Sequence, residues 1–317
     1  MNTLYFIAQQ TMYFAIPLLI VALGGMFSER SGIVNIALEG IMVVGAFAGI
    51  AFINVFQKSM SGQGLLLLSL LVAGIIGGVF SVFHAFAAIR LRADQTISGT
   101  ALNMFAPAFA IFTARMVQGV QQIQFSDTFY ISKVPFLGDI PFLGPILFRN
   151  CYITTYVGLF IALFSWIVIN HTRFGLRLRS CGEHPQAADS VGIHVYRIRY
   201  SVVIISGILA GIGGLTFVIP TSTNFNATVA GYGFLALAVL IFGQWRTNKI
   251  FFAAFFFGIM KTFASAYSGI PILKSLPISN EVYKMIPYIA TLIVLTFSSK
   301  NSQAPRAEGI PYDKGSR

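Results

Sequence analysis

Apolar runs of roughly 20 residues, separated by short polar stretches, recur along the whole chain. An α-helix needs about 20 such residues to cross a hydrocarbon core of ~30 Å with its backbone polar groups bonded internally. Membrane barrel strands would instead alternate apolar and polar residues over about 10 positions. The pattern predicts an all-α, polytopic transmembrane helical bundle. We predict about nine spans, in a range of eight to ten, near 5–26, 37–56, 64–89, 97–117, 151–170, 200–220, 233–245, 250–270 and 284–299.

The composition agrees with a membrane protein. Of the 317 residues 56% are hydrophobic and 10% charged, and the mean hydropathy is +0.77, whereas soluble domains carry about 25% charged residues. No Lys or Arg precedes Arg30 and no A-x-A cleavage pattern follows the first apolar run, so we expect this run to be retained as a span. Cys151 and Cys181 fall on opposite sides of the predicted membrane and cannot pair.

The basic residues predict an orientation. The net charge is +11, and 14 of the 21 Lys and Arg residues gather on one side of the predicted membrane. They lie in the loops at 27–36, 90–96, 171–199 and 246–249 and in the tail after the last span. Cytoplasmic loops collect Lys and Arg, so we predict an external N-terminus and a cytoplasmic C-terminus.

The longest predicted external segment, 118–150, contains the tetrapeptide PFLG twice, at 135–138 and 141–144. Proline at this density prevents a spanning helix, while Phe and Leu favour the bilayer surface. This segment is interpreted as an interfacial structural loop, with a contact surface for an external partner as the alternative.

Signatures of catalysis are absent from the sequence. There is no G-x-x-x-x-G-K-[ST] phosphate loop and no G-x-S-x-G elbow, and the four histidines lack metal-site spacing. We therefore predict that the chain is not an enzyme, has no metal site and binds no cofactor of its own. His84 lies within a span and is interpreted as a core residue that is hydrogen-bonded to a neighbouring helix.

The loop at 171–199 contains the pattern of a short helix outside the membrane. Pro185 suits a first helical turn, and Gly192 can end a helix in the left-handed conformation. Glu183 would complement the positive end of the helix dipole. Two interpretations are open: a basic loop that only sets topology, or a helix that docks into a groove of another protein.

Several segments resemble one family. The stretch at 178–193, LRSCGEHPQAADSVGI, looks like the cytoplasmic coupling segment of permease subunits of bacterial ATP-binding-cassette importers, in the branched-chain amino acid, ribose and nucleoside group. Further segments resemble the nucleoside or simple-sugar branch of that group, in the expected order along nearly the full chain: SERSGIVNIALEG (28–40), RADQTISGTALN (92–103), LAGIGG (209–214), GYGFLALAVLIFGQW (231–245) and GIPYDKGSR (309–317).

The resemblance implies one permease domain over 1–317, including the coupling loop 171–199 and the cytoplasmic tail 300–317, in the bacterial inner membrane. It implies a second, homologous permease, ATPase subunits that bind ATP and Mg²⁺, and an external substrate-binding protein or lipoprotein as partners. His184 stands where the family more often has Asn. The residues that the resemblance places at the ATPase are Glu183, Pro185, Ala187, Ala188, Asp189 and Gly192.

The implied function is import of a nucleoside or simple sugar with ATP hydrolysed by partner subunits. Import of ribose or of a branched-chain amino acid is an alternative within the group. An ion-coupled secondary transporter is a further alternative, although Glu39 lies near a predicted membrane surface rather than the midplane, where coupling carboxylates tend to lie.

Polar residues within spans are candidates for the solute path, because a charge buried in lipid costs about 2.5–3.5 kcal/mol on insertion scales. If 28–40 is helical, Asn35 and Glu39 share a face and form one polar patch, although a broken helix is an alternative. Glu39 would either cap or tie a broken helix or line the path, and Asn103 would either join helices or line the path. Lys261 lies at mid-depth, where we expect a carboxylate partner or a wet cavity.

Two further interpretations are structural. Asp94 precedes Thr96 and an apolar run, and it is predicted to cap the fourth span. Gly207, Gly211 and Gly214 form a stripe of small residues suited to close helix packing.

Overall fold

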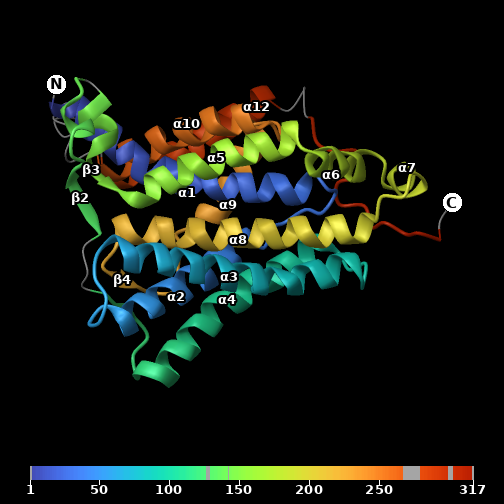
Figure 1. Ribbon diagram of the computed structural model, residues 1–317, viewed down its shortest axis with the longest axis horizontal. Coiled ribbons are helices and arrows are strands. Elements are labelled where there is room, and N and C mark those ends of the chain that lie inside the picture. Colours follow the sequence, from blue (N-terminus) through green and yellow to red (C-terminus); the bar gives the residue numbers. More distant parts are fainter. Residues whose placement is uncertain (1, 126–128, 142, 267–278, 299–302, 316–317) are drawn as a thin grey trace.

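The computed structural model describes residues 2–125, 129–141, 143–266, 279–298 and 303–315, most of which are helical (Figure 1). Parts of two predicted spans (267–270 and 299), of the predicted tail (300–302 and 316–317) and of the external segment (126–128 and 142) lie outside the described residues. The long helices are α1 (Asn2–Glu29), α2 (Leu38–Phe56), α3 (Gln63–Ile89), α4 (Gln95–Gln118), α5 (Ile153–His171), α8 (Val195–Thr221), α10 (Thr247–Ala266) and α12 (Asn280–Ser298). The shorter helices are α6 (Arg173–Glu183), α7 (Pro185–Ser190) and α9 (Tyr232–Phe242).

Each predicted span coincides with one helix, and the ends differ by only a few residues. Within the described residues, six helices are long and apolar enough to cross a membrane: α1 from Thr3 onward, α2, α3, α4, α5 and α8. Helix α9 has 11 residues, and at 1.5 Å per residue it spans only about 17 Å of a ~30 Å core. The chain is therefore a helical membrane bundle in which one apolar helix covers only part of the bilayer depth.

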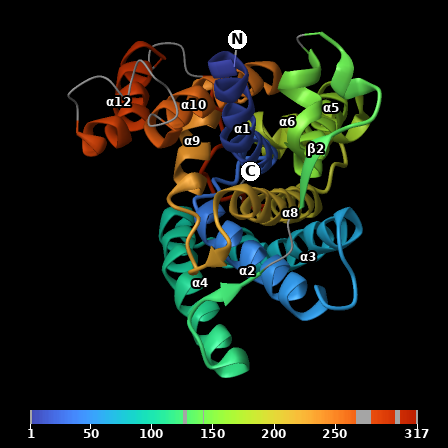
Figure 2. The same cartoon turned by 90° about the vertical axis from the view of Figure 1, so that its left-hand side faces the viewer.

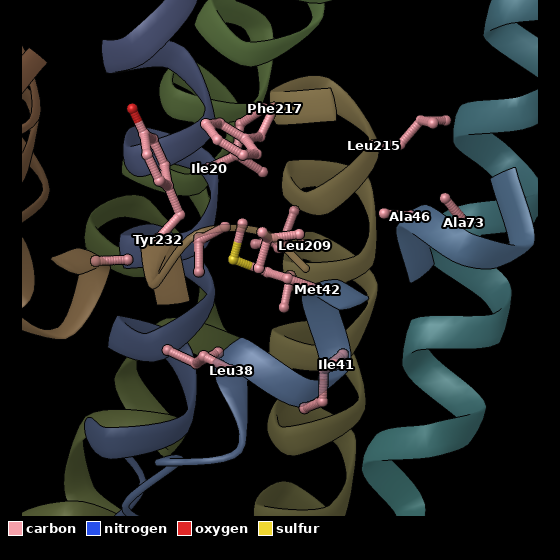
Figure 3. Close-up of a cluster of buried hydrophobic side chains, with 14 of the residues drawn as sticks. Ile20, Leu38, Ile41, Met42, Ala46, Ala73, Leu209, Leu215, Phe217 and Tyr232 are labelled. Atoms are coloured by element: carbon pink, nitrogen blue, oxygen red, sulfur yellow. The ribbon is translucent and has the colours of Figure 1, made fainter. Parts of the chain in front are cut away.

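Helices α1 and α8 lie at the centre of the bundle (Figure 2). Helix α8 packs against α1, α2 and α3, and α1 also packs against α5, α9 and α10. Apolar side chains of α1, α2, α8 and α9, among them Ile20, Met42, Leu209 and Phe217, form one buried cluster (Figure 3). Helix α4 leans away from the rest (Figure 2) and has few buried residues.

The predicted stripe of glycines on α8 is a packing surface. A side chain at Gly207 would clash with Ser81 of α3, and one at Gly211 with the carbonyl oxygen of Ala73. At Gly214 it would clash with the carbonyl oxygen of Met42 on α2. Small residues let helix backbones approach closely in membranes, so this interpretation is confirmed.

Short strands and turns cover the end of the bundle where the N-terminus lies (Figure 1). Strand β1 (Ile123–Gln124) pairs with β4 (Asn224–Phe225), and β2 (Tyr130–Lys133) pairs with β3 (Arg149–Tyr152). Between them lie a 3₁₀ turn, η1 (Leu137–Asp139), and a π-helical turn, η2 (Gly144–Phe148). As predicted, the described part of the PFLG segment contains no spanning helix.

Two smaller predictions are also confirmed. The Asp94 carboxylate accepts a hydrogen bond of 2.9 Å from the Ile97 amide and caps α4. His84 is buried, and its ring nitrogens lie 2.7 Å from Ser98 Oγ of α4 and 2.8 Å from the Val34 carbonyl oxygen. Cys151 and Cys181 are free and buried on β3 and α6, at opposite ends of the bundle (Figure 1).

Candidate solute path and coupling segment

Residues 30–37, the connector, join α1 to α2 without helical structure. Gly32 has φ +95°, a conformation that side chains disfavour, and this ends the helical course of α1. Backbone groups without helical partners inside a membrane protein must be satisfied by other protein groups. Four side chains from three helices, α3, α4 and α8, do this here. Gln95 accepts from the Val34 amide at 2.7 Å, Asn103 donates to the Ile36 carbonyl at 2.8 Å, and Arg199 donates to the Ser31 carbonyl at 3.0 Å, in addition to the His84 contact with Val34.

The connector overturns the prediction that Asn35 and Glu39 share a helix face. Asn35 lies in the non-helical connector, fully buried, and donates a hydrogen bond of 2.9 Å to Ser206 Oγ on α8. Glu39 lies on α2 and points to α9 instead. The two side chains therefore bind different helices, because the chain turns between them.

Glu39 caps the N-terminal end of α9. Its two carboxylate oxygens accept hydrogen bonds from the amides of Gly231, at 2.9 Å, and Gly233, at 2.6 Å. The first amides of a helix have no partner within it and carry partial positive charge, which a carboxylate complements. A side chain at Gly233 would clash with the backbone of Glu39, so glycine permits this close approach.

A cavity of about 490 Å³, called here the α9 cavity, lies between α9, α10 and α12. Its wall is mostly apolar, as is usual for small-molecule sites. Lys261 Nζ lies 5.5 Å from the centroid of the Tyr232 ring, within range of a cation–π interaction. The Tyr232 hydroxyl is buried and has no hydrogen-bond partner in the described part of the chain. The lining residues with functional groups or rings are Tyr232, Phe234, Lys261, Tyr288 and Thr291.

Of the four path candidates, the structure brings only Lys261 to this cavity. We expected either a carboxylate partner or a cavity around Lys261. No carboxylate within the described ranges lies within 4.0 Å of its ammonium, and the side chain lines a cavity instead. Asn103 bridges the connector and α2, donating to the Ile36 carbonyl and accepting from the Gly40 amide at 2.7 Å.

The predicted coupling helix is α7, at the opposite end of the bundle from the strands (Figure 1). Pro185 occupies its first turn, and Gly192 follows it with φ +84°. The Gly192 amide donates to the Asp189 carbonyl at 2.9 Å, and the Ile193 amide to the Ala188 carbonyl at 3.0 Å. These bonds satisfy the last carbonyls of the helix, as the sequence pattern predicted.

The predicted coupling residues do not form one exposed surface. Ala187 is exposed, whereas Pro185 and Ala188 are buried. Ala188 packs in a cluster with Cys181, Val195 and Tyr312. A helix turns about 100° per residue, so the adjacent Ala187 points in a different direction and is exposed. The exposed surface instead contains Glu183, Gln186, Ala187, Ser190, Val191 and Gly192, with Val191 75% exposed.

The chemistry of this cluster is structural. Burial raises the pKa of the Cys181 thiol to about 11. The thiol therefore stays protonated at neutral pH and behaves as a small apolar group. Asp189 is half-buried and lies 4.0 Å from Lys314 of the tail.

The coupling segment is connected to the connector by direct contacts. A side chain at Gly182 on α6 would clash with the carbonyl oxygen of Arg30. The tail crosses both elements, since the Ala307 amide donates to the Gly182 carbonyl at 2.8 Å and the Gly309 amide to the Gly32 carbonyl at 3.0 Å. Helix α6 therefore contacts the connector both directly and through the tail.

The family model described as the branched-chain amino acid transport system / permease component matches residues 7–295. This chain belongs to that permease family. The permease is a multi-pass protein of the cytoplasmic membrane and is not an enzyme.

Curated relatives match the permease over nearly its full length. It is 44% identical to the guanosine ABC transporter permease protein NupQ of Bacillus subtilis, covering 98% of this chain and 97% of the relative. It is 40% identical to the nucleoside ABC transporter permease protein NupC of Lactococcus lactis, covering 99% and 98%. The guanosine permease protein NupP of B. subtilis is 25% identical, covering 89% and 78%. No solved structure matches.

Sequence reasoning missed several residues of the permease's α9 cavity, namely Tyr232, Phe234, Tyr288 and Thr291. Aromatic residues are common throughout this chain, with 31 Phe and 12 Tyr. Their types alone therefore could not mark a site. The available signal was the glycine pair around Tyr232 in GYGF, which indicates a close backbone approach of the kind that Glu39 makes.

Proposed function

We propose that this permease is the membrane-spanning subunit of an ATP-binding-cassette importer and that it moves a nucleoside into the cell. The printed names of the two relatives that are 40% or more identical support the substrate class. The observation that carries the proposal within the structure is the α9 cavity, where aromatic rings and a few polar groups surround about 490 Å³.

The lining of this cavity suits a nucleoside chemically. A nucleobase has two flat faces that stack on aromatic rings, and the exposed rings of Phe234 and Tyr288 provide such faces. The ribose carries hydroxyls that need hydrogen-bond partners, and the Thr291 hydroxyl, as an acceptor, and the Lys261 ammonium, as a donor, provide them. The described wall of the cavity contains one lysine and no carboxylate. A nucleoside has no net charge, so no charge of the substrate would be buried without a partner.

A branched-chain amino acid is the second candidate, because the family description names that class. Lys261 could pair with its carboxylate. However, no Asp or Glu lines the described wall of the α9 cavity to receive the α-ammonium group, and an unpaired ammonium buried at this depth is costly. The cavity chemistry therefore favours the nucleoside.

The proposal includes the parts that the family resemblance implies. The chain forms one permease domain of about nine spans, with the N-terminus outside and α6, α7 and the tail in the cytoplasm. It pairs with a second, homologous permease, as the presence of two guanosine permease relatives in B. subtilis suggests. Partner ATPases bind ATP and Mg²⁺ and contact the exposed surface of α7, and an external binding protein delivers the solute.

Coupling follows the contacts described above. ATP-driven closure of the ATPases moves α7 and α6, and Gly182 transmits the movement to the connector at Arg30. Asn35 and Asn103 hold the connector to α8 and α4, and Glu39 carries the displacement to the start of α9. The α9 cavity then opens to one side or the other, which is a rigid-body switch between two packings.

The test is uptake of radiolabelled guanosine by vesicles that contain the assembled importer, with leucine and ribose as competitors. A Tyr288→Ala variant should lower guanosine uptake by about tenfold, since base–aromatic stacking contributes about 1–3 kcal/mol. Tyr288→Phe should retain most of it. Phe160→Ala, which removes a 67% exposed ring of α5 outside the cavity, is the matched control and should leave uptake unchanged. No saturable guanosine uptake, or guanosine uptake that leucine inhibits as strongly as unlabelled guanosine does, would contradict the proposal.

A further inference from the structure

A second cavity, called here the basic cavity, lies at the end of the bundle that carries α6 and the tail. Its volume is about 800 Å³, and it is formed by the start of the connector, by the end of α5, by α6, by the start of α10 with the two residues before it and by the tail. Both tryptophans of the chain, Trp166 and Trp245, line it. The proposed solute path does not use this cavity, whereas Arg30 and Glu183 of its wall belong to the proposed coupling contacts as well.

Positive charge dominates its wall. Five cationic side chains line the cavity against one carboxylate, that of Glu183, and the cationic residues are Arg30, Arg179, Arg246, Lys249 and Arg306. None of the five forms an ion pair of 4.0 Å or less with a described residue. Five positive charges with one carboxylate among them in a concave wall repel one another, and binding an anion would relieve that repulsion.

The contacts of Arg30 show how closely the cations are gathered. Its guanidinium donates a hydrogen bond of 2.9 Å to the Trp245 carbonyl. Burial lowers the pKa of Arg30, the nearby charges of Arg179 and Arg246 lower it further, and the Glu183 carboxylate raises it. An anion at this position would interact with several guanidiniums at once.

The backbone adds to this field. Thr247, Asn248 and Lys249, the first residues of the 20-residue helix α10, line the same cavity. The first amides of a helix have no partner within it, and together with the helix dipole they favour phosphate groups.

An apolar groove continues from the basic cavity along the surface between α5 and α10, which contact each other. The groove has a volume of about 550 Å³ and shares Trp166, Thr247 and Asn248 with the basic cavity. Exposed apolar side chains such as Leu163 and Phe252, 58% and 72% exposed, are part of its wall. An anionic group and a hydrocarbon chain of one ligand could therefore occupy the two depressions together.

We propose that the basic cavity binds the headgroup of an anionic phospholipid and that the groove between α5 and α10 holds one of its acyl chains. The combination of five unpaired cations, a helix N-terminus and a continuous apolar groove carries the inference. A free phosphate compound shares the headgroup chemistry but would leave the groove empty.

The two tryptophans make the test direct, because both line the cavity and report on its contents. The purified full-length chain in detergent micelles is titrated with phosphatidylglycerol or phosphatidylcholine, and tryptophan emission is recorded. Phosphatidylglycerol should produce a saturable change with an affinity at least about tenfold higher than that of phosphatidylcholine, since basic pockets at the cytoplasmic side select anionic headgroups. Native mass spectrometry of the same samples counts the retained lipids. Equal binding of the two lipids would overturn the proposal.

Two pairs of variants separate the headgroup from the chain. Arg246→Gln/Arg306→Gln should weaken phosphatidylglycerol binding about 30-fold, because each basic residue near anionic lipid contributes about a factor of five. Arg177→Gln/Arg197→Gln removes the same charge from exposed residues outside the cavity and should change binding by less than about twofold. Phe252→Ala should weaken binding about threefold through lost apolar contact, while Phe160→Ala should have no effect.

Glycerophosphoglycerol, the headgroup without acyl chains, distinguishes binding of a phospholipid from binding of a free phosphate compound. If it binds as tightly as phosphatidylglycerol, or if the Arg177/Arg197 control weakens lipid binding as much as the Arg246/Arg306 variant, the proposal is wrong. These measurements need no transport, so they fail or succeed independently of the proposed function.

Discussion

The α9 cavity and the basic cavity arrange their charges in opposite ways. The α9 cavity has one ammonium, Lys261, over an aromatic ring, and the nearby Glu39 carboxylate is fully engaged by backbone amides. The basic cavity gathers five cations and one carboxylate at the end of the bundle. A charge within the bilayer costs several kcal/mol and must have a fixed partner. Charges at a membrane surface are solvated and can remain unpaired until a counter-ion arrives.

The same contrast applies to the surfaces around the cavities. Around α9, polar contacts hold helices in place, as Glu39 and Asn103 do. Around α7, the exposed residues are free for a partner while Ala188 and Pro185 anchor the helix from beneath. The surface around α7 thus leaves side chains exposed, whereas the polar groups around α9 hold helices in position.

The largest expected effect separates the two sides of α7. Ala188→Arg places a guanidinium in the cluster with Cys181, Val195 and Tyr312, so the free energy of unfolding should fall by about 3 kcal/mol or more. Ala187→Arg, on the exposed side, should change it by less than about 0.5 kcal/mol yet prevent co-purification of the ATPase. Denaturation in detergent and affinity co-purification measure the two effects. Normal uptake by Ala187→Arg would exclude α7 as the docking helix.

Glu39→Ala tests the membrane side of the comparison. The variant loses the two hydrogen bonds that the Gly231 and Gly233 amides donate to the carboxylate. We expect the free energy of unfolding to fall by about 3 kcal/mol and uptake to be lost. Glu281→Ala is the control, because its carboxylate also lies in a first helical turn but is 76% exposed. That control should change the stability by less than about 0.5 kcal/mol. Equal effects of the two variants would contradict the capping role.

One lysine from each cavity sharpens the contrast further. Lys261→Met should lower guanosine uptake about tenfold, since it removes a hydrogen-bonding charge from the proposed solute site, where such a bond contributes about 1.5–3 kcal/mol. Lys249→Met, in the basic cavity, should leave uptake within about twofold and weaken phosphatidylglycerol binding instead. Initial uptake rates and the tryptophan titration provide the two readouts. Full uptake by Lys261→Met would remove its role in the solute path.

The smallest expected effect concerns Cys181. Burial raises its pKa from an ordinary value near 9.0 to about 11, so the folded state favours the neutral thiol. The stability it contributes is complete below about pH 9 and is lost as the pH rises through about 11. In a Cys151→Ser variant, alkylation by iodoacetamide at pH 8 should be about a hundredfold slower in the native than in the denatured chain. Equal rates would show that the thiol is accessible as thiolate.

Local rules predicted much of the site's framework. The positions of the long helices followed from apolar run lengths, the Asp94 cap from a short polar side chain before a helix, and the end of α7 from Gly192. Asn35 was predicted less well, because a helical spacing was assumed across a connector whose backbone is held by side chains from distant helices. Such bonds join residues far apart in sequence, and no local pattern encodes them.

By itself, the sequence determined that this protein crosses a membrane as a bundle of helices and that it contains a short helix followed by Gly192. These features depend on hydrophobicity and backbone conformation, which are properties of neighbouring residues. Only the tertiary structure decided that Glu39 caps α9, that Ala188 faces inward while Ala187 faces outward, and that five cations from separate segments share one cavity. The physical reason is that the partner of each of these groups is supplied by the packing of helices, and packing is a property of the whole chain.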